Sequence, residues 1–303
     1  MPEMNNQKRI IVFHSSASDK RVCRLKEETE KMNLEFESFN LHRDVPMTQD
    51  GLYKIAGHLP IVLDKNTLCW ILSNSNLSHY FEKLYSKSTY FTWPTQSSID
   101  FSDKMFANHF LARARVKTPK TILVSCEKTL LDGIRYVGGF PCVIKKTFGS
   151  GGAEVELVGS IESLKKFIRN IYQNKADKEL VPFLRSSFIL QEYIESARGS
   201  DYRVLCLDGE LLGGIKRNSQ NGDFRANLYL GGKAEPFAID QKLEKACQAI
   251  IQKGKLFYAG LDFIKNGDQY LAIEINTSAQ FQGFEEATGI NVAKKIIEAL
   301  VKK

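Results

Sequence analysis

The sequence lacks the marks of several common protein classes. Its six cysteines include no CxxC pair and suggest no disulfide framework, and several, such as Cys142, lie in apolar runs. All five histidines precede residue 110 without HExxH spacing, which argues against a histidine-ligated metal. No apolar run reaches 18 residues, and the polar start makes a poor signal peptide. We therefore expect a cytoplasmic protein with reduced cysteines and no membrane partner.

The charge distribution argues against a nucleic-acid interface. The net charge is +7, from 42 Lys and Arg against 35 Asp and Glu, but no basic run exceeds two residues. Such a surface favours small anionic partners that carry phosphate or carboxylate groups. With 303 residues, of which 43% are hydrophobic, the chain can form two or three domains.

The first part of the chain alternates between strand and helix patterns. Residues 8–13, 34–40 and 59–64 predict strands, and 19–33 predicts an amphipathic helix. This order indicates a small open α/β unit, without the GxGxxG fingerprint of dinucleotide-binding domains. The pattern changes near residues 95–100, where we place a domain boundary.

The later part predicts a mixture of helices and antiparallel hairpins. A helix runs through Phe101–Ala112 with Ser102 as a plausible N-cap, and strand 186–194 follows later. Asp208-Gly209 and Asn266-Gly267 predict tight hairpin turns. Further helices are predicted at 160–174, 244–260 and 291–301.

The stretch DQYLAIEINTS places polar residues in a strand that otherwise reads as buried. Glu274 and Asn276 are two residues apart, so they face the same side of the strand. The Asn266-Gly267 turn should bring Asp262 beside them. Three such oxygen donors suit Mg²⁺. The alternative is that Glu274 pairs with a lysine at a sheet edge.

Two further segments could recognise phosphate. In IKKTFGSGG, Gly149, Gly151 and Gly152 allow close approach to phosphate oxygens beside Lys145, although the Walker pattern is absent. A basic segment follows later and includes Lys216, Arg217, Arg225 and Asn227, with Arg203 on the preceding strand. Guanidinium groups bind carboxylate and phosphate in bidentate fashion. The alternative is an exposed basic hairpin.

Taken in order, these motifs resemble the ATP-grasp superfamily. They are DK at 103–104, FPCVIKKTFGSGG, LQEYIESARGSDYRVL, IKRNSQNGDFRANLYLGG, GLDFI, EINTS and GFEEATGINVAKKIIEAL. The resemblance covers residues 98–303 and is closest to RimK-type amino-acid ligases. It implies an α/β and α+β architecture, an ATP-grasp fold preceded by a small open-sheet domain. We expect domains at 1–97, 98–195 and 196–303.

The resemblance also implies roles for individual residues. Lys104 and Lys145 match phosphate contacts, Glu192 and Tyr193 the adenine hinge, and Asp201 a position near the ribose. The full ATP-binding set is Lys104, Lys145, Gly149, Ser150, Gly151, Gly152, Gln191, Glu192, Tyr193, Ile194, Asp201, Lys216, Ala226 and Asn227. The magnesium ligands are Asp262, Glu274 and Asn276, and the candidate catalytic residues are Arg203, Arg217 and Arg225.

The reaction implied is the ATP-dependent joining of a carboxylate and an amine through an acyl phosphate. Its cofactors are ATP and two Mg²⁺ ions, for which Mn²⁺ can substitute. A glutamate-like amino acid is the expected donor, and the acceptor is a small molecule, a peptide or a protein C-terminus. A homo-oligomer fits the family. A peptide-tailoring ligase acting on a ribosomal precursor and a non-catalytic ATP-binding regulatory module remain alternatives.

Two departures from the family pattern concern loops. Glu154 stands where the phosphate loop often has a second glycine, and Ala279-Gln280 replaces the common Pro-Gly after EINTS. Because the second loop lies beside the acceptor site in relatives, the acceptor cannot be inferred from the resemblance.

Overall fold

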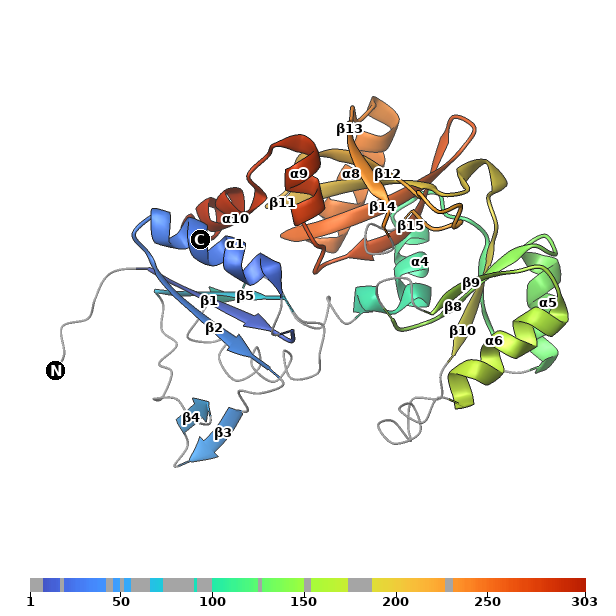
Figure 1. Cartoon of the computed structure of the whole chain (residues 1–303), viewed down its shortest axis with the longest axis horizontal. Coiled ribbons are helices and arrows are strands. Elements are labelled where there is room, and N and C mark those ends of the chain that lie inside the picture. Colours follow the sequence, from blue (N-terminus) through green and yellow to red (C-terminus); the bar gives the residue numbers. More distant parts are fainter. Residues whose placement is uncertain are drawn as a thin grey trace.

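The chain folds into three groups of elements, which Figure 1 shows in blue, in green to yellow, and in yellow-gold to red. The computed structural model describes residues 8–16, 19–41, 46–49, 52–55, 66–72, 90–91, 100–124, 127–149, 154–173, 187–226 and 231–303. Among these residues, no helix is long and apolar enough to cross a membrane.

The first group is an open parallel sheet, which confirms the predicted α/β unit. Its strands, in spatial order, are β2 (Glu35–Asn40), β1 (Arg9–His14), β5 (Thr67–Ile71) and β6 (Tyr90–Phe91). Helix α1 (Lys20–Lys31) makes the crossover from β1 to β2. Strand β5 was not predicted from the sequence, whereas the predicted strand 59–64 lies outside the described residues. A separate hairpin joins β3 (Pro46–Gln49) to β4 (Leu52–Ile55).

The second group is an antiparallel sheet with helices on one face. Its strands, in spatial order, are β7 (Thr121–Val124), β10 (Phe188–Glu192), β8 (Cys142–Lys146) and β9 (Val155–Val158). Helices α5 (Glu127–Tyr136) and α6 (Ile161–Gln173) cover a core that contains Ile144 and Leu190. Alternation along the strands turns the next residues, Lys145 and Gln191, to the opposite face.

Helix α4 (Lys104–Arg113) connects the first two groups. Its N-cap is Asp103, not the predicted Ser102: the Asp103 carboxylate accepts the backbone N–H groups of Met105 and Phe106. Asp103 can satisfy two free N–H groups of the first turn at once, which fixes the start of the helix.

The third group is a five-stranded antiparallel sheet. Its strands, in spatial order, are β13 (Lys233–Phe237), β12 (Glu210–Asn218), β11 (Ser200–Leu207), β14 (Tyr258–Asn266) and β15 (Gln269–Asn276). Both predicted hairpins are confirmed. Asp208, Gly209 and Gly267 have positive φ angles, as such tight turns require.

Three helices pack around this sheet. They are α8 (Gln241–Gly254), α9 (Gln282–Thr288) and α10 (Val292–Val301). The predicted helix 244–260 is wrong at its end, because Lys255 takes a left-handed conformation and ends α8, and Tyr258 already begins β14. Trp70 of the first group packs on Tyr258 with ring centroids 5.3 Å apart, so the first and third groups share one core.

Strand β15 contains a bulge. Asp262 pairs with Glu274, but the next residue, Phe263, pairs with Ala272, which leaves Ile273 as an extra residue. The bulge therefore resets the alternation of side chains within the strand.

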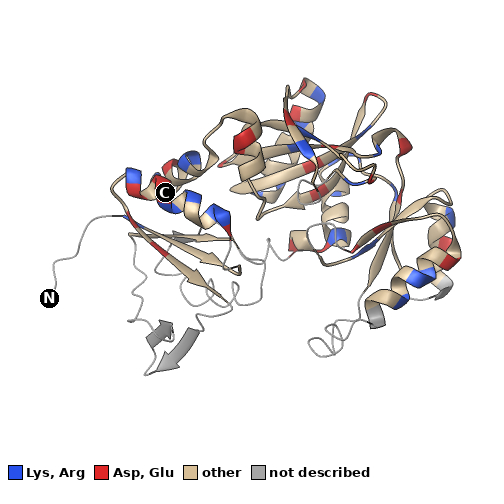
Figure 2. Cartoon of the chain, in the orientation of Figure 1, with Lys and Arg blue, Asp and Glu red and all other residues tan. Residues whose placement is uncertain are grey.

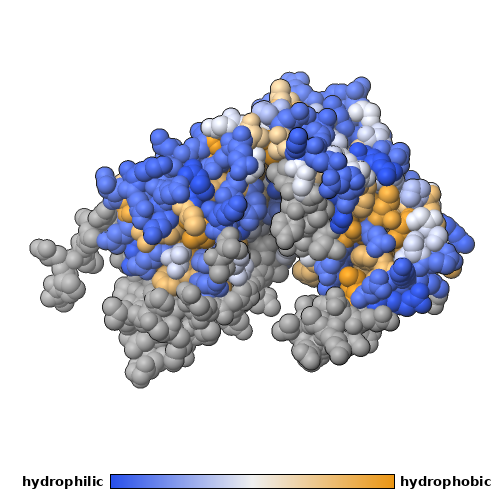
Figure 3. Space-filling model, viewed as in Figure 1, coloured by the Kyte–Doolittle hydropathy of each residue, from blue (hydrophilic) through white to orange (hydrophobic). Residues whose placement is uncertain are grey.

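Surface properties differ among the groups. Lys and Arg are interspersed with Asp and Glu along the helices (Figure 2), as expected for a solvated surface. Apolar residues gather over the second group on the face shown in Figure 3. The large hydrophobic side chains that are exposed in the described chain lie between Phe106 and Phe148.

Candidate active site

One face of the third sheet carries six of the predicted site residues. Cross-strand pairing places Asp201 opposite Arg217, and Asp262 between Arg203 and Glu274. Since residues two apart on a strand share a face, Asn276 joins them. The shared-face residues are Asp201, Arg203, Arg217, Asp262, Glu274 and Asn276.

Two arginines and two aspartates form a buried network on this face. Arg217 donates to both carboxylate oxygens of Asp201 at 2.5 and 2.8 Å, and to Asp262 at 3.0 Å. Arg203 donates to both oxygens of Asp262 at 2.7 and 2.6 Å. Asp201, Arg217 and Asp262 are all less than 10% exposed. Each charge is therefore balanced by an opposite charge, as burial requires.

The network sets the pKa values of the two aspartates in opposite directions. Burial alone would raise the pKa of Asp262, but Arg203 and Arg217 outweigh burial and hold that pKa below its usual value. For Asp201, burial raises the pKa by more than Arg217 lowers it, and the nearby negative charge of Asp262 raises it further.

Glu274 is different, because its carboxylate makes no hydrogen bond or ion pair with any described residue. It lies directly opposite Asp262 and is half-buried. The amide oxygen of Asn276 accepts the Ser278 N–H at 3.1 Å and keeps a second lone pair. Glu274 thus offers an unpaired carboxylate, and the side-chain oxygens of Asp262 and Asn276 beside it keep free lone pairs. This set of ligands fits Mg²⁺, which takes few protein ligands and keeps several waters.

Two lysines extend toward this face: Lys145 of the second group, and Lys104 at the start of the connecting helix α4. Lys145 Nζ donates to the Gln191 side-chain oxygen at 2.7 Å, and Lys104 Nζ donates to the Gly149 carbonyl at 2.9 Å. Desolvation lowers the pKa of both lysines, and the charge of Glu274 opposes that shift in each. Lys104, Lys145 and Glu274 thus lie within electrostatic reach of one another, although they belong to different groups of elements.

If Lys145 contacts nucleotide phosphate, as the family resemblance implies, nucleotide affinity is expected to fall above pH 8. Burial lowers the pKa of Lys145 to about 8, so above that pH the free protein must take up a proton to present a charged lysine to phosphate. We expect the affinity for ADP to fall by up to about tenfold per pH unit above pH 8 and to change little below it. Isothermal titration at several pH values measures this, and Lys145→Arg, which stays charged, should abolish the decline. An unchanged pH profile in that variant would contradict the assignment to Lys145.

The hinge between the second and third groups contains a small apolar cluster. Ile194, Ala197 and Leu271 are buried there, with Ile264 packed beside them. Gln191 also donates to Thr121 at 2.9 Å, and Glu192 accepts the Lys120 N–H at 3.1 Å. The hinge residues were predicted from the sequence, but Leu271 was not. It is three residues from Glu274, a spacing that puts two side chains on opposite faces of a regular strand, and only the bulge brings both to one face.

Two predicted residues lie apart from the network. Lys216 is opposite Tyr202 on the other face of the sheet, where it lines a cavity of 340 Å³ with Lys265. Arg225 is held by Asp223 at 2.7 and 3.0 Å, and it also donates to the Val155 carbonyl of β9 at 3.4 Å.

Other predicted residues are only partly described. Ala226 is buried. Ser150, Gly151, Gly152 and Asn227 lie outside the described residues. Glu154, which follows residues 150–153 in the chain, forms an ion pair with Lys146 at 3.1 Å. A Cβ atom at Gly149 would lie 2.5 Å from the Glu154 carboxylate, so the lack of a side chain at Gly149 allows that carboxylate to lie close to the backbone.

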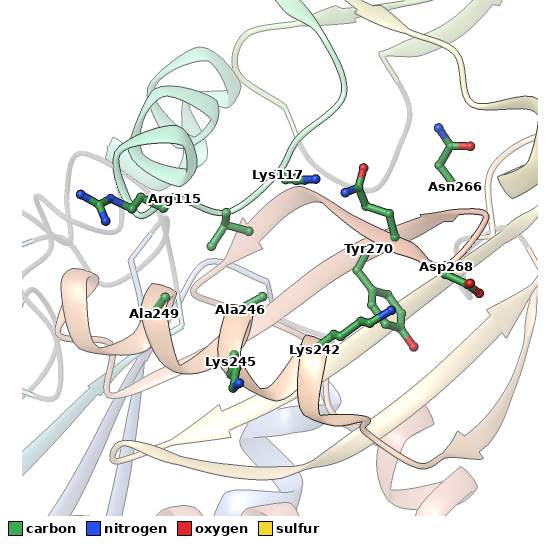
Figure 4. A pocket seen from close by; sticks show the side chains of 11 residues that line it. Arg115, Lys117, Lys242, Lys245, Ala246, Ala249, Asn266, Asp268 and Tyr270 are labelled. Carbon is green, nitrogen blue, oxygen red and sulfur yellow. The ribbon is translucent and has the colours of Figure 1, made fainter.

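A cavity of 630 Å³ lies away from these residues, between α8, the start of β15 and the segment before β7. Figure 4 shows Lys242 of α8 reaching toward Tyr270, and Arg115 and Lys117 on the opposite side. Tyr270 packs against Tyr202, so this cavity is on the same side of the sheet as Lys216.

The fold and the family match define an ATP-grasp ligase. Residues 101–300 match the model of the RimK-like ATP-grasp domain, and the chain belongs to that family. The chain is 31% identical over 249 residues to the coenzyme gamma-F420-2:alpha-L-glutamate ligase of Methanocaldococcus jannaschii, covering 77% of this chain and 81% of that protein. It is 33% identical to the probable alpha-L-glutamate ligase 2 of Shewanella amazonensis, covering 66% of this chain and 63% of that protein.

Solved structures agree with the fold over nearly the whole chain. The ATP-grasp ligase PsnB, complexed with a minimal precursor, aligns with a TM-score of 0.70 and 18% identity, covering 98% of this chain and 99% of that one. D-cycloserine synthetase DcsG aligns with a TM-score of 0.71 and 14% identity, covering 97% and 99%. These matches include the first group of elements, which lies before the matched family region.

Proposed function

We propose that the protein is an ADP-forming, Mg²⁺-dependent ligase that joins an amino acid to a carboxylate through an acyl phosphate. Glutamate is the preferred candidate for the added amino acid, because the curated relatives are named glutamate ligases. The observation that carries the proposal is the unpaired Glu274 carboxylate opposite Asp262, with Lys104 and Lys145 within electrostatic reach. The proposed domains remain 1–97, 98–195 and 196–303.

Nucleotide binding would draw on three parts of the face. Lys104 and Lys145 would donate to phosphate oxygens, and the apolar cluster around Leu271 would hold the adenine beside the hinge. Asp262, Glu274 and Asn276 would hold Mg²⁺, which neutralises phosphate charge during phosphoryl transfer. Asp201 is already bound to Arg217, so we now assign it to orienting that arginine rather than to the ribose.

Arg203 and Arg217 are suited to stabilise the acyl phosphate. Each uses its Nε and Nη2 atoms on aspartates, and the Nη1 atom of each makes no hydrogen bond with a described residue. Donors fixed in this way can stabilise charge that develops on an oxyanion without further reorganisation. Arg225 is held by Asp223 and donates to the Val155 carbonyl at the start of β9, so we propose that it helps to keep β9 beside the acyl phosphate.

A peptide acceptor is the second candidate. The structural agreement with PsnB extends across the first group of elements, and PsnB is described with a precursor peptide. The first group would then contribute to holding a peptide.

The test is ADP release from purified protein with ATP and Mg²⁺. Each amino acid is supplied alone and then with a small-molecule fraction or a peptide fraction of a cell extract, and products are followed by mass spectrometry. ADP release with a mass gain of one residue on an acceptor is expected, and the fraction that supports it separates the two acceptor classes. MgATP binding without ADP release in any mixture would instead favour a regulatory module.

A further inference from the structure

A buried arginine of the first group reaches the loop that follows the proposed metal strand. Arg21, in the first turn of α1, donates through Nη1 to the carbonyl of Ser278. Its Nε and Nη2 atoms are held by Asp19, at 2.9 and 2.5 Å. The side chains of Arg21 and Asp19 are only 6% and 5% exposed. This contact is therefore a fixed part of the interior rather than a surface ion pair.

The same serine also orients a proposed metal ligand. The backbone N–H of Ser278 donates to the side-chain oxygen of Asn276 at 3.1 Å. The next carbonyl, of Ala279, accepts the hydroxyl of the buried Tyr258 at 2.9 Å. Two buried donors thus fix the loop on successive carbonyls, and the loop in turn fixes the rotamer of Asn276.

We infer that Arg21 is a positioning residue for the metal site, acting through Ser278 on Asn276. This inference rests on the proposed function. Groups that orient metal ligands typically change metal affinity 10- to 100-fold when removed. The first group of elements would accordingly form part of the metal site.

Arg24 provides a matched control within the same helix. It also crosses between the groups, donating to Glu285 at 3.1 Å and to Asn291 at 3.3 Å, but it makes no hydrogen bond with the loop 277–281. If Arg21 only docked α1, loss of either arginine should have similar effects on metal binding. If Arg21 positions Asn276, only its loss should weaken metal binding.

The experiment measures Mn²⁺ binding in the presence of ADP by electron paramagnetic resonance, on full-length protein. Arg21→Gln is combined with Asp19→Asn, so that no buried carboxylate loses its partner and the helix cap is kept. We expect the double variant to bind Mn²⁺ about tenfold more weakly. Arg24→Gln should stay within about twofold, as for a partly exposed pair. Similar losses in both would overturn the inference.

A double-mutant cycle with Asn276→Ala separates positioning from general effects. If Arg21 acts through Asn276, adding the Asp19 and Arg21 changes to Asn276→Ala should weaken Mn²⁺ binding no further. Additive losses would overturn the inference but leave the proposed function intact. A wild-type protein that binds no Mn²⁺ with ADP would overturn both.

Discussion

Replacement of Glu274 by Gln is expected to lower the rate of ADP formation by about 10³-fold without unfolding the protein. Glu274 is the carboxylate on the site face that has no hydrogen-bond or ion-pair partner among the described residues, so its charge is available for a cation. The substitution keeps the shape and removes that charge. Steady-state ADP release at saturating MgATP measures the effect.

Glu235→Gln is the matched control for that change. Glu235 lies on β13 of the same sheet and is exposed, with a 3.3 Å hydrogen bond from Asn218. Its variant should keep full activity. Undiminished turnover in Glu274→Gln would remove the metal assignment from this strand.

Replacement of Arg217 by Met is expected to lower the free energy of unfolding by about 3–5 kcal/mol. Arg217 is 4% exposed and binds both Asp201 and Asp262, so its removal leaves Asp201 without its ion partner and Asp262 with Arg203 alone. An uncompensated buried charge is among the few causes of losses this large. Urea denaturation followed by circular dichroism measures the change.

Neutralising Asp201 should reverse much of this loss. Adding Asp201→Asn to Arg217→Met removes the carboxylate that has lost its partner and keeps the ion pair of Arg203 with Asp262, and we expect stability to recover while activity does not. A loss within about 0.5 kcal/mol for Arg217→Met alone would show that the network is not closed as described. Arg198→Met, at an exposed position, serves as the reference for removal of a surface arginine.

Local signals were sufficient to predict the hairpins that build the site. Asn266-Gly267 predicts a tight turn, and the pairing of β14 with β15 confirms that hairpin. The register of the turn alone would set Asp262 opposite Ile273, so it is the bulge, which was not predicted, that places Asp262 opposite Glu274. Strand alternation would also have separated Lys216 from Arg217, since adjacent residues of β12 face opposite sides. The two residues were grouped as one basic segment because they are adjacent in the chain.

The arginine network depended on information that the local sequence does not contain. Arg217 meets Asp262 only because β14 pairs with β11 on the side away from β12, a strand order set by the whole fold. Likewise, the end of α8 depends on the left-handed Lys255, a conformation that residues other than glycine seldom adopt. A periodic pattern alone therefore extended this helix into β14.

The bulge at Ile273 has a consequence for how this strand can vary in length. Leu271 and Glu274 are an odd number of residues apart, yet both lie on the site face because Ile273 is extra. Loss of that one residue would turn either the apolar side chain or the carboxylate to the opposite side, whereas a change of its side chain would not. Members of the family with a working site should therefore tolerate substitutions at this position but neither insertions nor deletions between the two residues.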